Sequence, residues 1–434
     1  MSKISRAHAI FRIASISATA ILVGCGGGGG ASGSSTNQTD TPSALTASQI
    51  ASYSDQQIID LGTSINQLSP AALGALTEWT RSIINSPNPN GQIQSLTPTQ
   101  IEALSPEQVR HIGTQGGTYP AKISFLNATT WKQLVSSTAQ VQAILPGEIT
   151  SMNGDKISAI GANIQFLTTE ALRSLSYGTL ASRPLGQIQS LTAAQINALS
   201  PAQVRLIGKS AGNIIAQLNW LNSDAWAALA VNPEQVKALT PTELADINGD
   251  KITALGENIQ HLSDDALASL SYYTLVNRPL GHIQSLTADQ IRTLSPSQVR
   301  MIGIDIPPAV AKLHKLDIDT WIALTSVPEQ VSAITATEIL YLPGERIAAM
   351  DVNIAGLSDS AMCAIRAGTS LEMQILPGQI QSITAAQIRA LSPRQYSIIA
   401  GANNGNGAEY LKASAAAAVS AEQLAAAQGP WPCL

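Results

Sequence analysis

Three arginines recur at regular intervals along the sequence and could bind an acidic ligand. Arg110, Arg205 and Arg300 each end a Gln-Val-Arg triplet, and the three triplets are evenly spaced. In a regular array they would form a spaced row on one side, where guanidinium groups attract an acidic polymer or the acidic patch of a partner. The alternative is a solvated arginine beside a local carboxylate such as Glu107, which contributes little to stability. Ser397 replaces the arginine in the last copy.

A second candidate for chemistry is a set of oxygen-bearing side chains at alternate positions, which calcium ions prefer as ligands. Asp246, Asn248 and Asp250 are followed by Glu257, and this spacing resembles an EF-hand loop. Lys251, however, stands where the sharp turn of that loop requires glycine. Asn is also a favoured helix N-cap, and an acidic residue in the first turn suits the helix dipole. We therefore interpret Asn248 as an N-cap and expect neither a metal site nor a cofactor.

The histidines do not point to catalysis. His111 shares its phase with Leu206 and Met301, and His261 shares its phase with Phe166. A catalytic or metal-bound histidine would not be expected to exchange with apolar residues. Phosphate-loop, Cys-x-x-Cys and His-Glu-x-x-His motifs do not occur in the sequence, and the Gly-x-Ser-x-Gly match at 208–212 lacks the preceding strand of a nucleophile elbow. We expect a protein that is not an enzyme. The alternative is an exported hydrolase with a single active site on a degenerate repeat.

An internal repeat accounts for these spacings. Four near-copies of Gly-Gln-Ile-Gln-Ser-Leu begin at Gly91, Gly186, Gly281 and Gly378. A weaker pattern opens with an apolar residue and ends, four and five positions later, with a polar residue and Ile or Leu. The sequence therefore predicts about eight repeats of roughly 48 residues, alternating between two types. The repeats begin at Leu45, Leu96, Ile144, Leu191, Leu239, Leu286, Ile334 and Ile383.

A finer pattern of period eight inside each repeat predicts very short helices. The segment 96–101 reads Leu-Thr-Pro-Thr-Gln-Ile, and 104–109 reads Leu-Ser-Pro-Glu-Gln-Val. Thr97 or Ser105 can cap a helix, and the glutamine three positions later completes a capping box inside a hydrophobic staple. Proline at the first helical position lacks only an N–H that would be unpaired anyway. With no alternating β-branched runs, the pattern predicts an all-α solenoid of short capped helices over residues 45–400.

Composition and charge argue against nucleic acid as a partner. Charged residues make up 12% of the chain, with 24 basic and 29 acidic side chains. Without the three basic residues of the leader described below, 21 basic against 29 acidic side chains leave a net charge of −8. Such a balance disfavours phosphate binding. The segment Leu104 to Val109 resembles the opening of a TAL-effector DNA-binding repeat. That likeness covers only a capping-box opening, the period of that family is shorter, and we expect no DNA binding here.

Three tryptophans and an Ala-rich end complete the array. Two successive repeats, one of each type, form a double repeat. Trp131, Trp226 and Trp321 occupy the same position in three successive double repeats. Their apolar neighbours at helical spacing favour packing between repeats, and the alternative is a carbohydrate-stacking face. The Ala-rich segment from Ala408 to Gln428 predicts a closing helix. We expect residues 401–434 to form a terminal cap, which a solenoid needs to avoid edge-on association.

The N-terminus carries an export signal. Lys3, Arg6 and Arg12 precede a short apolar run that ends in Leu-Val-Gly-Cys25. Such a basic start and apolar run are typical of a secretory leader, and the ending resembles the lipobox of bacterial lipoproteins. The resemblance implies removal of residues 1–24 and lipidation of Cys25, which anchors the chain to a membrane. Gly26 is not the aspartate that retains such proteins at the inner membrane, so the outer membrane is favoured. Residues 25–44 form a Gly/Ser-rich flexible tether.

Export also permits a disulfide between the remaining cysteines, Cys363 and Cys433, because exported chains meet an oxidising environment. Two unpaired thiols remain the alternative, since the sequence does not fix the distance between them. From these observations we expect a non-enzymatic, lipid-anchored protein of the cell envelope. It would act as a binding or scaffold module for a protein or polysaccharide ligand. The side of the outer membrane that it faces stays open.

Overall fold

The computed structural model describes residues 41–433 except 79–90, 116, 118, 179–185, 211, 273–280, 305–310 and 368–377. The chain divides into two regions, Met1–Thr41 and Pro42–Leu434. The predicted leader and Cys25 lie outside the described residues. In the second region every regular element that the structure describes is an α-helix or a 3₁₀ helix, labelled η. The prediction of an all-α fold is confirmed for this part of the chain.

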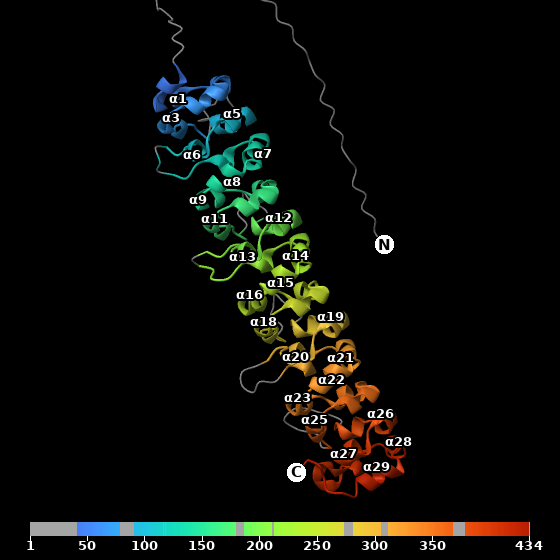
Figure 1. Cartoon of the computed structure of the whole chain (residues 1–434). Helices are drawn as coiled ribbons and strands as arrows, with labels where there is room; N and C mark the ends of the chain where they lie inside the picture. Colours follow the sequence, from blue (N-terminus) through green and yellow to red (C-terminus); the bar gives the residue numbers. More distant parts are fainter. Residues whose placement is uncertain are drawn as a thin grey trace, which may run out of the picture. The chain divides into compact units, whose positions relative to one another are not determined.

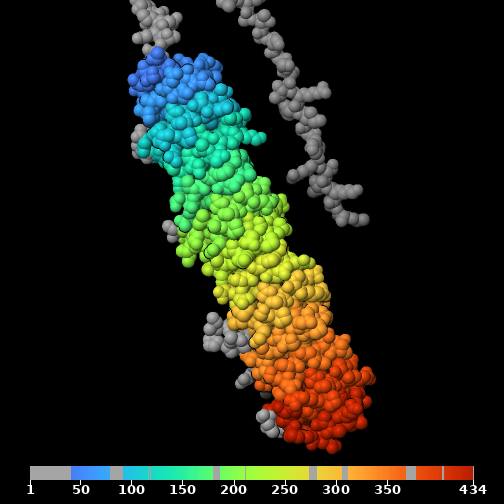
Figure 2. All heavy atoms as spheres, in the orientation of Figure 1, coloured from blue at the N-terminus to red at the C-terminus, as the bar shows by residue number. Residues whose placement is uncertain are grey.

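The elements recur in a fixed order and follow one another in chain order through the second region (Figures 1 and 2). The opening elements are η1 (Pro42–Ala44), α1 (Ala47–Ser52), α2 (Asp55–Asp60), η2 (Gly62–Gln67), α3 (Pro70–Gly74), α4 (Gln92–Ser95), α5 (Pro98–Ala103) and α6 (Pro106–Val109). The next are η3 (Ile123–Phe125), α7 (Ala128–Ser136), α8 (Thr138–Ala143), α9 (Pro146–Ile149), α10 (Gly154–Ala159), η4 (Gly161–Phe166), α11 (Thr169–Arg173), η5 (Ile188–Ser190), α12 (Ala193–Ala198) and α13 (Pro201–Val204).

The series from η3 to α13 is repeated twice with the same order of helix types. The first copy is η6 (Leu218–Trp220), α14 (Ser223–Ala230), α15 (Pro233–Lys237), α16 (Pro241–Asp246), α17 (Gly249–Thr253), η7 (Gly256–His261), α18 (Asp264–Ala268), η8 (Ile283–Ser285), α19 (Ala288–Thr293) and α20 (Pro296–Val299). The second is η9 (Leu313–Lys315), α21 (Ile318–Thr325), α22 (Pro328–Ala333), α23 (Ala336–Tyr341), α24 (Gly344–Ala349), η10 (Asp351–Gly356), α25 (Asp359–Cys363), η11 (Ile380–Ser382), α26 (Ala385–Ala390) and α27 (Pro393–Gly405). The chain then closes with η12 (Gly407–Tyr410), α28 (Ala413–Ala416) and α29 (Ala421–Ala426).

Capping boxes start many of these short helices, as the sequence predicts. At α5 the Thr97 hydroxyl accepts the N–H of Gln100 at 3.3 Å, and the Gln100 Oε1 accepts the N–H of Thr97 at 2.9 Å. Ser105 and Gln108 make the same pair at the start of α6. A helix of one or two turns has almost no stability of its own, because nucleation is not repaid over so short a length. Such helices therefore depend on their caps and on their neighbours.

The glutamine of the box also joins one repeat to the repeat before it. The Nε2 of Gln100 donates to the carbonyl of Ile58 at 2.6 Å, and Gln100 is fully buried. Each side chain of this kind thus accepts an N–H within its own helix and donates to a carbonyl in the preceding repeat. The same bridge recurs from Gln195 to Ile157, from Gln290 to Ile252 and from Gln387 to Ile347.

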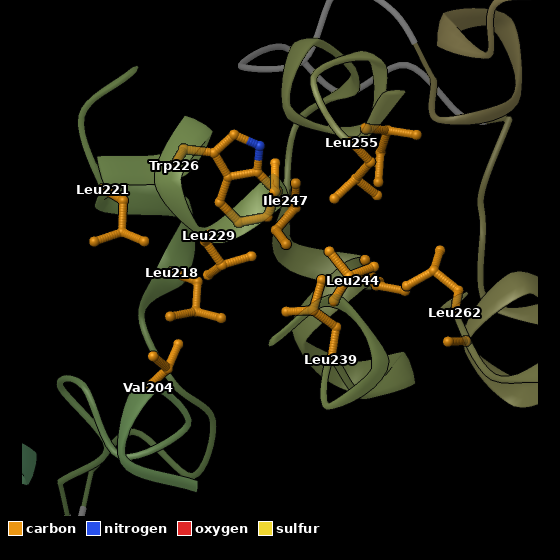
Figure 3. Close-up of a cluster of buried hydrophobic side chains, with 14 of the residues drawn as sticks. Val204, Leu218, Leu221, Trp226, Leu229, Leu239, Leu244, Ile247, Leu255 and Leu262 are labelled. Atoms are coloured by element: carbon orange, nitrogen blue, oxygen red, sulfur yellow. The ribbon is translucent and has the colours of Figure 1, made fainter. Parts of the chain in front are cut away.

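The core is a continuous layer of Leu, Ile and Val side chains, interrupted by the three tryptophans. Trp131, Trp226 and Trp321 are 1%, 2% and 0% exposed, and Figure 3 shows the aliphatic side chains around Trp226. Each indole Nε1 donates at 2.9 Å to a backbone carbonyl 25 residues further along the chain. The tryptophans therefore pack between successive helices inside the fold.

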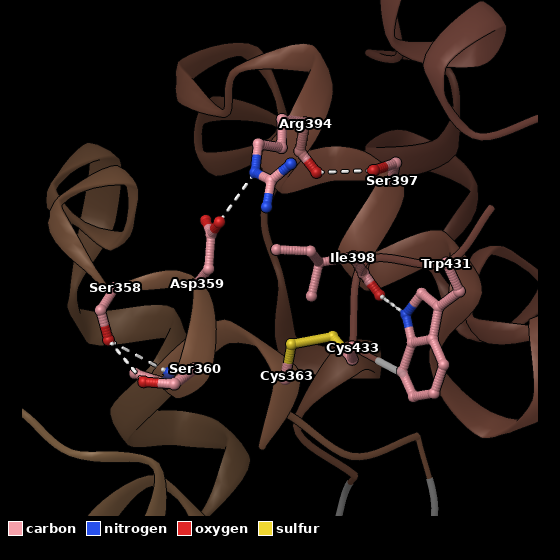
Figure 4. The surroundings of a disulfide bond; sticks show 10 residues. Ser358, Asp359, Ser360, Cys363, Arg394, Ser397, Ile398, Trp431 and Cys433 are labelled. Atoms are coloured by element: carbon pink, nitrogen blue, oxygen red, sulfur yellow. Dashed lines mark hydrogen bonds and ion pairs between the residues drawn. A yellow bond between two sulfur atoms is a disulfide. The ribbon is translucent and has the colours of Figure 1, made fainter. Parts of the chain in front are cut away.

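The C-terminal end is held by two contacts (Figure 4). Cys363 in α25 and Cys433 form a disulfide, with their Cα atoms 5.7 Å apart. Trp431 donates its Nε1 proton to the carbonyl of Ile398 at 3.0 Å. Gly401 makes room for this indole, since a Cβ there would lie 2.1 Å from a Trp431 ring carbon.

The Ala-rich end differs in detail from the sequence-based expectation. Instead of one closing helix, Ala408 to Gln428 contains the end of η12, then α28 and α29. Ser420 starts α29 with a capping box, so a new helix begins there. The helix α27 continues to Gly405 and crosses the expected boundary after residue 400. Gln423 of α29 donates to carbonyls of α26 and the residue after it, as the glutamines of earlier repeats do.

Replacing a buried bridging glutamine should lower the free energy of unfolding more than replacing a glutamine that makes the same bonds nearer the surface. Gln195 is fully buried, whereas Gln203 makes equivalent bonds to Ser200 and to the Gln165 carbonyl at a more exposed position. Gln195→Ala leaves the N–H of Thr192 without its side-chain acceptor and removes one of the two donors to the Ile157 carbonyl, so we expect a loss of about 2 kcal/mol. Gln203→Ala should cost less than about 1 kcal/mol. Urea denaturation of the full chain measures both, and equal losses would contradict the bridging role.

Reduction of the disulfide should loosen the C-terminal end alone. The bond closes a loop across a sequence separation of 70 residues. The chain-entropy model gives about 4 kcal/mol for a loop of this size. Because the elements contact mainly their neighbours, the loss should stay local. In hydrogen exchange, Cys363→Ser should speed exchange in α27 to α29 and leave α5 to α13 unchanged. Faster exchange throughout the chain would contradict this expectation.

Candidate functional site

Two of the three arginines of the predicted row contact residues far along the chain, whereas Arg300 is exposed. Arg110 is half-exposed, and its Nε donates to the carbonyl of Ala143 at 2.9 Å. The Arg205 Nε lies 3.6 Å from a carboxylate oxygen of Glu243, whose side chain is 2% exposed. The expected neighbour Glu107 does contact Arg110, at 3.4 Å, but it is an exposed residue on the same turn. Arg110 and Arg205 therefore make contacts inside the array and are also partly exposed to solvent.

Each arginine is matched by a buried glutamate in the following repeat, always at the same spacing. Arg110 is followed by Glu148, Arg205 by Glu243 and Arg300 by Glu338. The first repeat has no equivalent arginine before it, and it carries Gln49 in the glutamate position. In these repeats arginine and glutamate thus occur together, as expected if the two side chains stabilise each other.

The glutamates form a second kind of cap. A Glu148 carboxylate oxygen accepts the N–H of Leu145 at 2.8 Å at the start of α9, and the side chain is buried. Burial raises the pKa of Glu148 to about 7, although the N–H groups of Leu145 and Ala121 and the charge of Arg110 oppose this shift.

Glu338 has the same surroundings in a later repeat. Burial raises its pKa, and hydrogen bonds from Thr335 and the charge of Arg300 oppose that rise. Where the neighbours offer N–H groups and a guanidinium, a carboxylate fits the site that glutamine fills elsewhere.

The calcium-like sequence forms a helix cap. The Asn248 side chain accepts the N–H of Lys251 at 3.0 Å, as an N-cap does. The Lys251 ammonium donates to the carbonyls of Leu218, Asn219 and Leu221 at 3.2, 2.6 and 2.8 Å. Burial lowers the pKa of Lys251 to about 8. Among the described residues no group of three His, Cys, Asp or Glu side chains is arranged to hold a metal ion.

The buried histidine His282 has a structural role. His282 is 1% exposed; its Nδ1 accepts the N–H of Ser271 at 3.2 Å, and its Nε2 lies 2.6 Å from the carbonyl of Ile247. These contacts assign the proton to Nε2. Gln187 bonds to the equivalent groups one double repeat earlier. His282 therefore substitutes for a buried glutamine that joins helices within one repeat.

One cleft contains two basic residues, Arg173 and Lys209, that do not recur at the equivalent positions elsewhere in the array. It lies between the end of α11 and the segment after Gly208, and has a volume of about 530 Å³. No described residue forms a hydrogen bond or ion pair with the Arg173 or Lys209 side chain. The residues that line the cleft are Glu170, Arg173, Ser174, Lys209, Ser210 and Ile214.

An exposed aromatic pair is formed by the same two segments. Tyr177 follows Ser174 by three positions, and Trp220 follows Ile214 by six. Their rings stack at 4.6 Å between centroids with an interplanar angle of 9°. Tyr177 is 37% exposed and Trp220 is 41% exposed.

Sequence reasoning missed both the cleft and this pair, although a comparison of equivalent repeat positions contains the signal. The residue at the end of α11 is Arg173, whereas α18 ends in Ala268. The residue after the recurring glycine is Lys209 here and Ile304 one double repeat later. A search for cations that interrupt the repeat would have found both positions.

Comparison with known proteins assigns no family to this chain. No protein-family model matches it, and no curated protein matches its sequence. Among the described residues, no helix combines the length and the apolar character needed to cross a lipid bilayer.

The buried glutamate should make stability depend on pH. Because the pKa of Glu148 is raised from 4.5 to about 7, the folded chain binds this proton more tightly than the unfolded chain. The free energy of unfolding should therefore fall as the pH rises through this interval, by on the order of 2 kcal/mol for this group. Glu148→Gln, which places the residue of the first repeat here, should reduce that fall in urea denaturation at pH 5 and pH 8. The control, Glu107→Gln, removes an exposed carboxylate near the same arginine and should keep the wild-type difference.

Proposed function

We propose that this protein is a non-enzymatic binding or scaffold module built as an α-solenoid of about eight repeats. The observation that carries the proposal is the contrast between recurring and non-recurring polar residues. Recurring side chains contact neighbouring repeats, by hydrogen bonds at Gln195 and Trp226 and by an ion pair at Arg205. Non-recurring charges such as Arg173 and Lys209 line a cleft instead. In repeat proteins, side chains that make no contact between repeats are the ones that can select a ligand.

The repeat arrangement is supported by the order of the elements and by the bonds between repeats. The series from η3 to α13 recurs from η6 to α20 and from η9 to α27. The bridging bonds connect adjacent repeats, as in Gln290 to Ile252 at 2.8 Å. Such nearest-neighbour contacts are what a solenoid uses in place of a single closed core.

We further propose that the chain is anchored in the outer membrane through a lipid on Cys25, after removal of residues 1–24. The basic residues, the short apolar run and the Leu-Val-Gly-Cys ending support this proposal. The expected tether of residues 25–44 then lies between the lipid and the helical region, but it is shorter than expected because Pro42–Ala44 form η1. The protein needs no cofactor.

The alternative function, an exported hydrolase, is tested directly on the purified full chain. A panel of ester, glycoside and peptide substrates should show no turnover above that of a heat-denatured control. Turnover that disappears in the variant Arg173→Ala, Lys209→Ile, but remains in variants elsewhere on the surface, would favour the hydrolase.

The anchor is tested by Cys25→Ser. Without the thiol there is no attachment point for a diacylglyceryl group, so the variant should leave the membrane fraction and carry no fatty-acid label. Wild-type protein should sediment with outer membranes and carry the label. A wild-type chain that takes up no fatty-acid label, or a variant that stays in the membrane fraction, would contradict lipid anchoring.

A further inference from the structure

We propose that the cleft beside α11 binds an acidic glycan, with Arg173 and Lys209 holding the anionic groups and the Tyr177–Trp220 pair stacking on a sugar ring. This inference rests on the proposed function, because it names the ligand class of the binding module. The cleft has a volume of about 530 Å³. That volume lies within the usual range for small-ligand sites.

The first support is a positive charge that has no ion-pair partner among the described residues. Arg173 and Lys209 both line the cleft, and no described residue forms an ion pair with either side chain. Glu170 is the one carboxylate among the lining residues. The lining thus carries a net positive charge on a protein that is acidic as a whole. An anionic ligand is the partner that this charge fits.

The second support is that the fold does not require these cations. A basic residue at a helix C-terminus is favoured by the helix dipole, which is one reason to find Arg173 in the last turn of α11. The equivalent helices α3 and α18, however, end in Gly74 and Ala268 without a basic residue in their last turn. The position of Lys209 is likewise occupied by Ile304 one double repeat later.

The third support identifies a sugar as the carrier of the charge. Aromatic rings at a binding site favour ligands with flat apolar surfaces, and a pyranose ring presents such a surface through its C–H groups. Tyr177 and Trp220 are partly exposed and stack on each other three and six positions after the cleft residues Ser174 and Ile214, outside the lining itself. The serine hydroxyls of the cleft suit sugar hydroxyls as hydrogen-bond partners.

The aromatic pair is specific to this place in the array. One double repeat earlier, the position equivalent to Tyr177 is Glu78. Each of the two directly follows a residue whose N–H bonds to a buried glutamine. Glu78 forms an ion pair with Lys122. One double repeat later, the Lys315 ammonium lies 5.0 Å from the centre of the Tyr272 ring. Both neighbouring places therefore contain a cation in contact with a side chain of the protein, whereas the place beside the cleft presents two stacked rings.

The test uses hexameric galacturonate as an acidic probe and maltohexaose as a neutral one, with titration calorimetry on the full chain. The combined variant Arg173→Ala, Lys209→Ile carries the residues of the next double repeat, so the fold should accept it. It should bind the acidic hexamer at least about tenfold more weakly than the wild type. The matched control, Lys132→Ala with Lys237→Ser, removes the same charge at exposed positions and also uses residues of the next double repeat. Its affinity should be that of the wild type.

The aromatic pair has its own pair of variants. Trp220→Ala should weaken binding of the acidic hexamer about fivefold or more, since the indole face is lost. Trp220→Phe, which copies Phe125 of the previous double repeat, should keep most of the affinity. Equal effects of the two variants would overturn the stacking role.

Several results would overturn the glycan site. These are absence of binding to the acidic hexamer, equal affinity for maltohexaose, equal affinity of the cleft and control variants, or full displacement by millimolar inorganic phosphate. Weaker binding in both charge variants alike would also overturn it, because it would indicate a diffuse charge effect. Release of reducing ends from the hexamer would instead overturn the non-enzymatic function, and the cleft would remain the binding site.

Discussion

The buried side-chain bridge between repeats is the interaction on which the rest of this structure depends. A helix of one or two turns cannot be stable by itself, because the cost of nucleation is spread over too few hydrogen bonds. Here a single glutamine closes the cap of its own helix and bonds to a carbonyl of the preceding repeat, as Gln195 does with Thr192 and Ile157. The same amide thus starts a helix and fixes its position. Loss of the bridge would remove a hydrogen bond from a polar group in each of the two repeats.

The alternation of glutamine and glutamate follows from the groups that each repeat offers. A carbonyl acceptor upstream requires the amide of glutamine, whereas Leu145, Ala121 and Arg110 present donors and a positive charge to Glu148. His282 shows that the requirement is for one acceptor and one donor rather than for an amide, since its imidazole supplies both. The start of the array agrees with this account, because the repeat without a preceding arginine carries glutamine in place of glutamate.

Much of the fold is predictable from the sequence because its rules are local. The capping boxes, the proline positions and the packing of the tryptophans depend on residues that lie close in sequence or recur at fixed spacing. The Arg205–Glu243 contact does not follow from local pattern, since it joins side chains of different repeats. Sequence reasoning alone therefore places the arginines on a solvated face.

The recurring pattern itself predicts neither the cleft nor the disulfide. The cleft beside α11 is signalled only where the pattern is broken, at Arg173 and Lys209. The disulfide stays open at the level of sequence because no pattern sets the distance between Cys363 and Cys433, which the fold brings together.

The central claim is that the recurring polar residues hold successive repeats together. A double-mutant cycle at Arg205 and Glu243 tests it most directly, with the substitutions that the ends of the array already carry, Arg205→Ser and Glu243→Gln. If the two side chains stabilise each other, the summed losses of the single variants should exceed the loss of the double variant by about 1–3 kcal/mol in urea denaturation. Additivity within about 0.3 kcal/mol would contradict the claim and return the arginines to the solvent face.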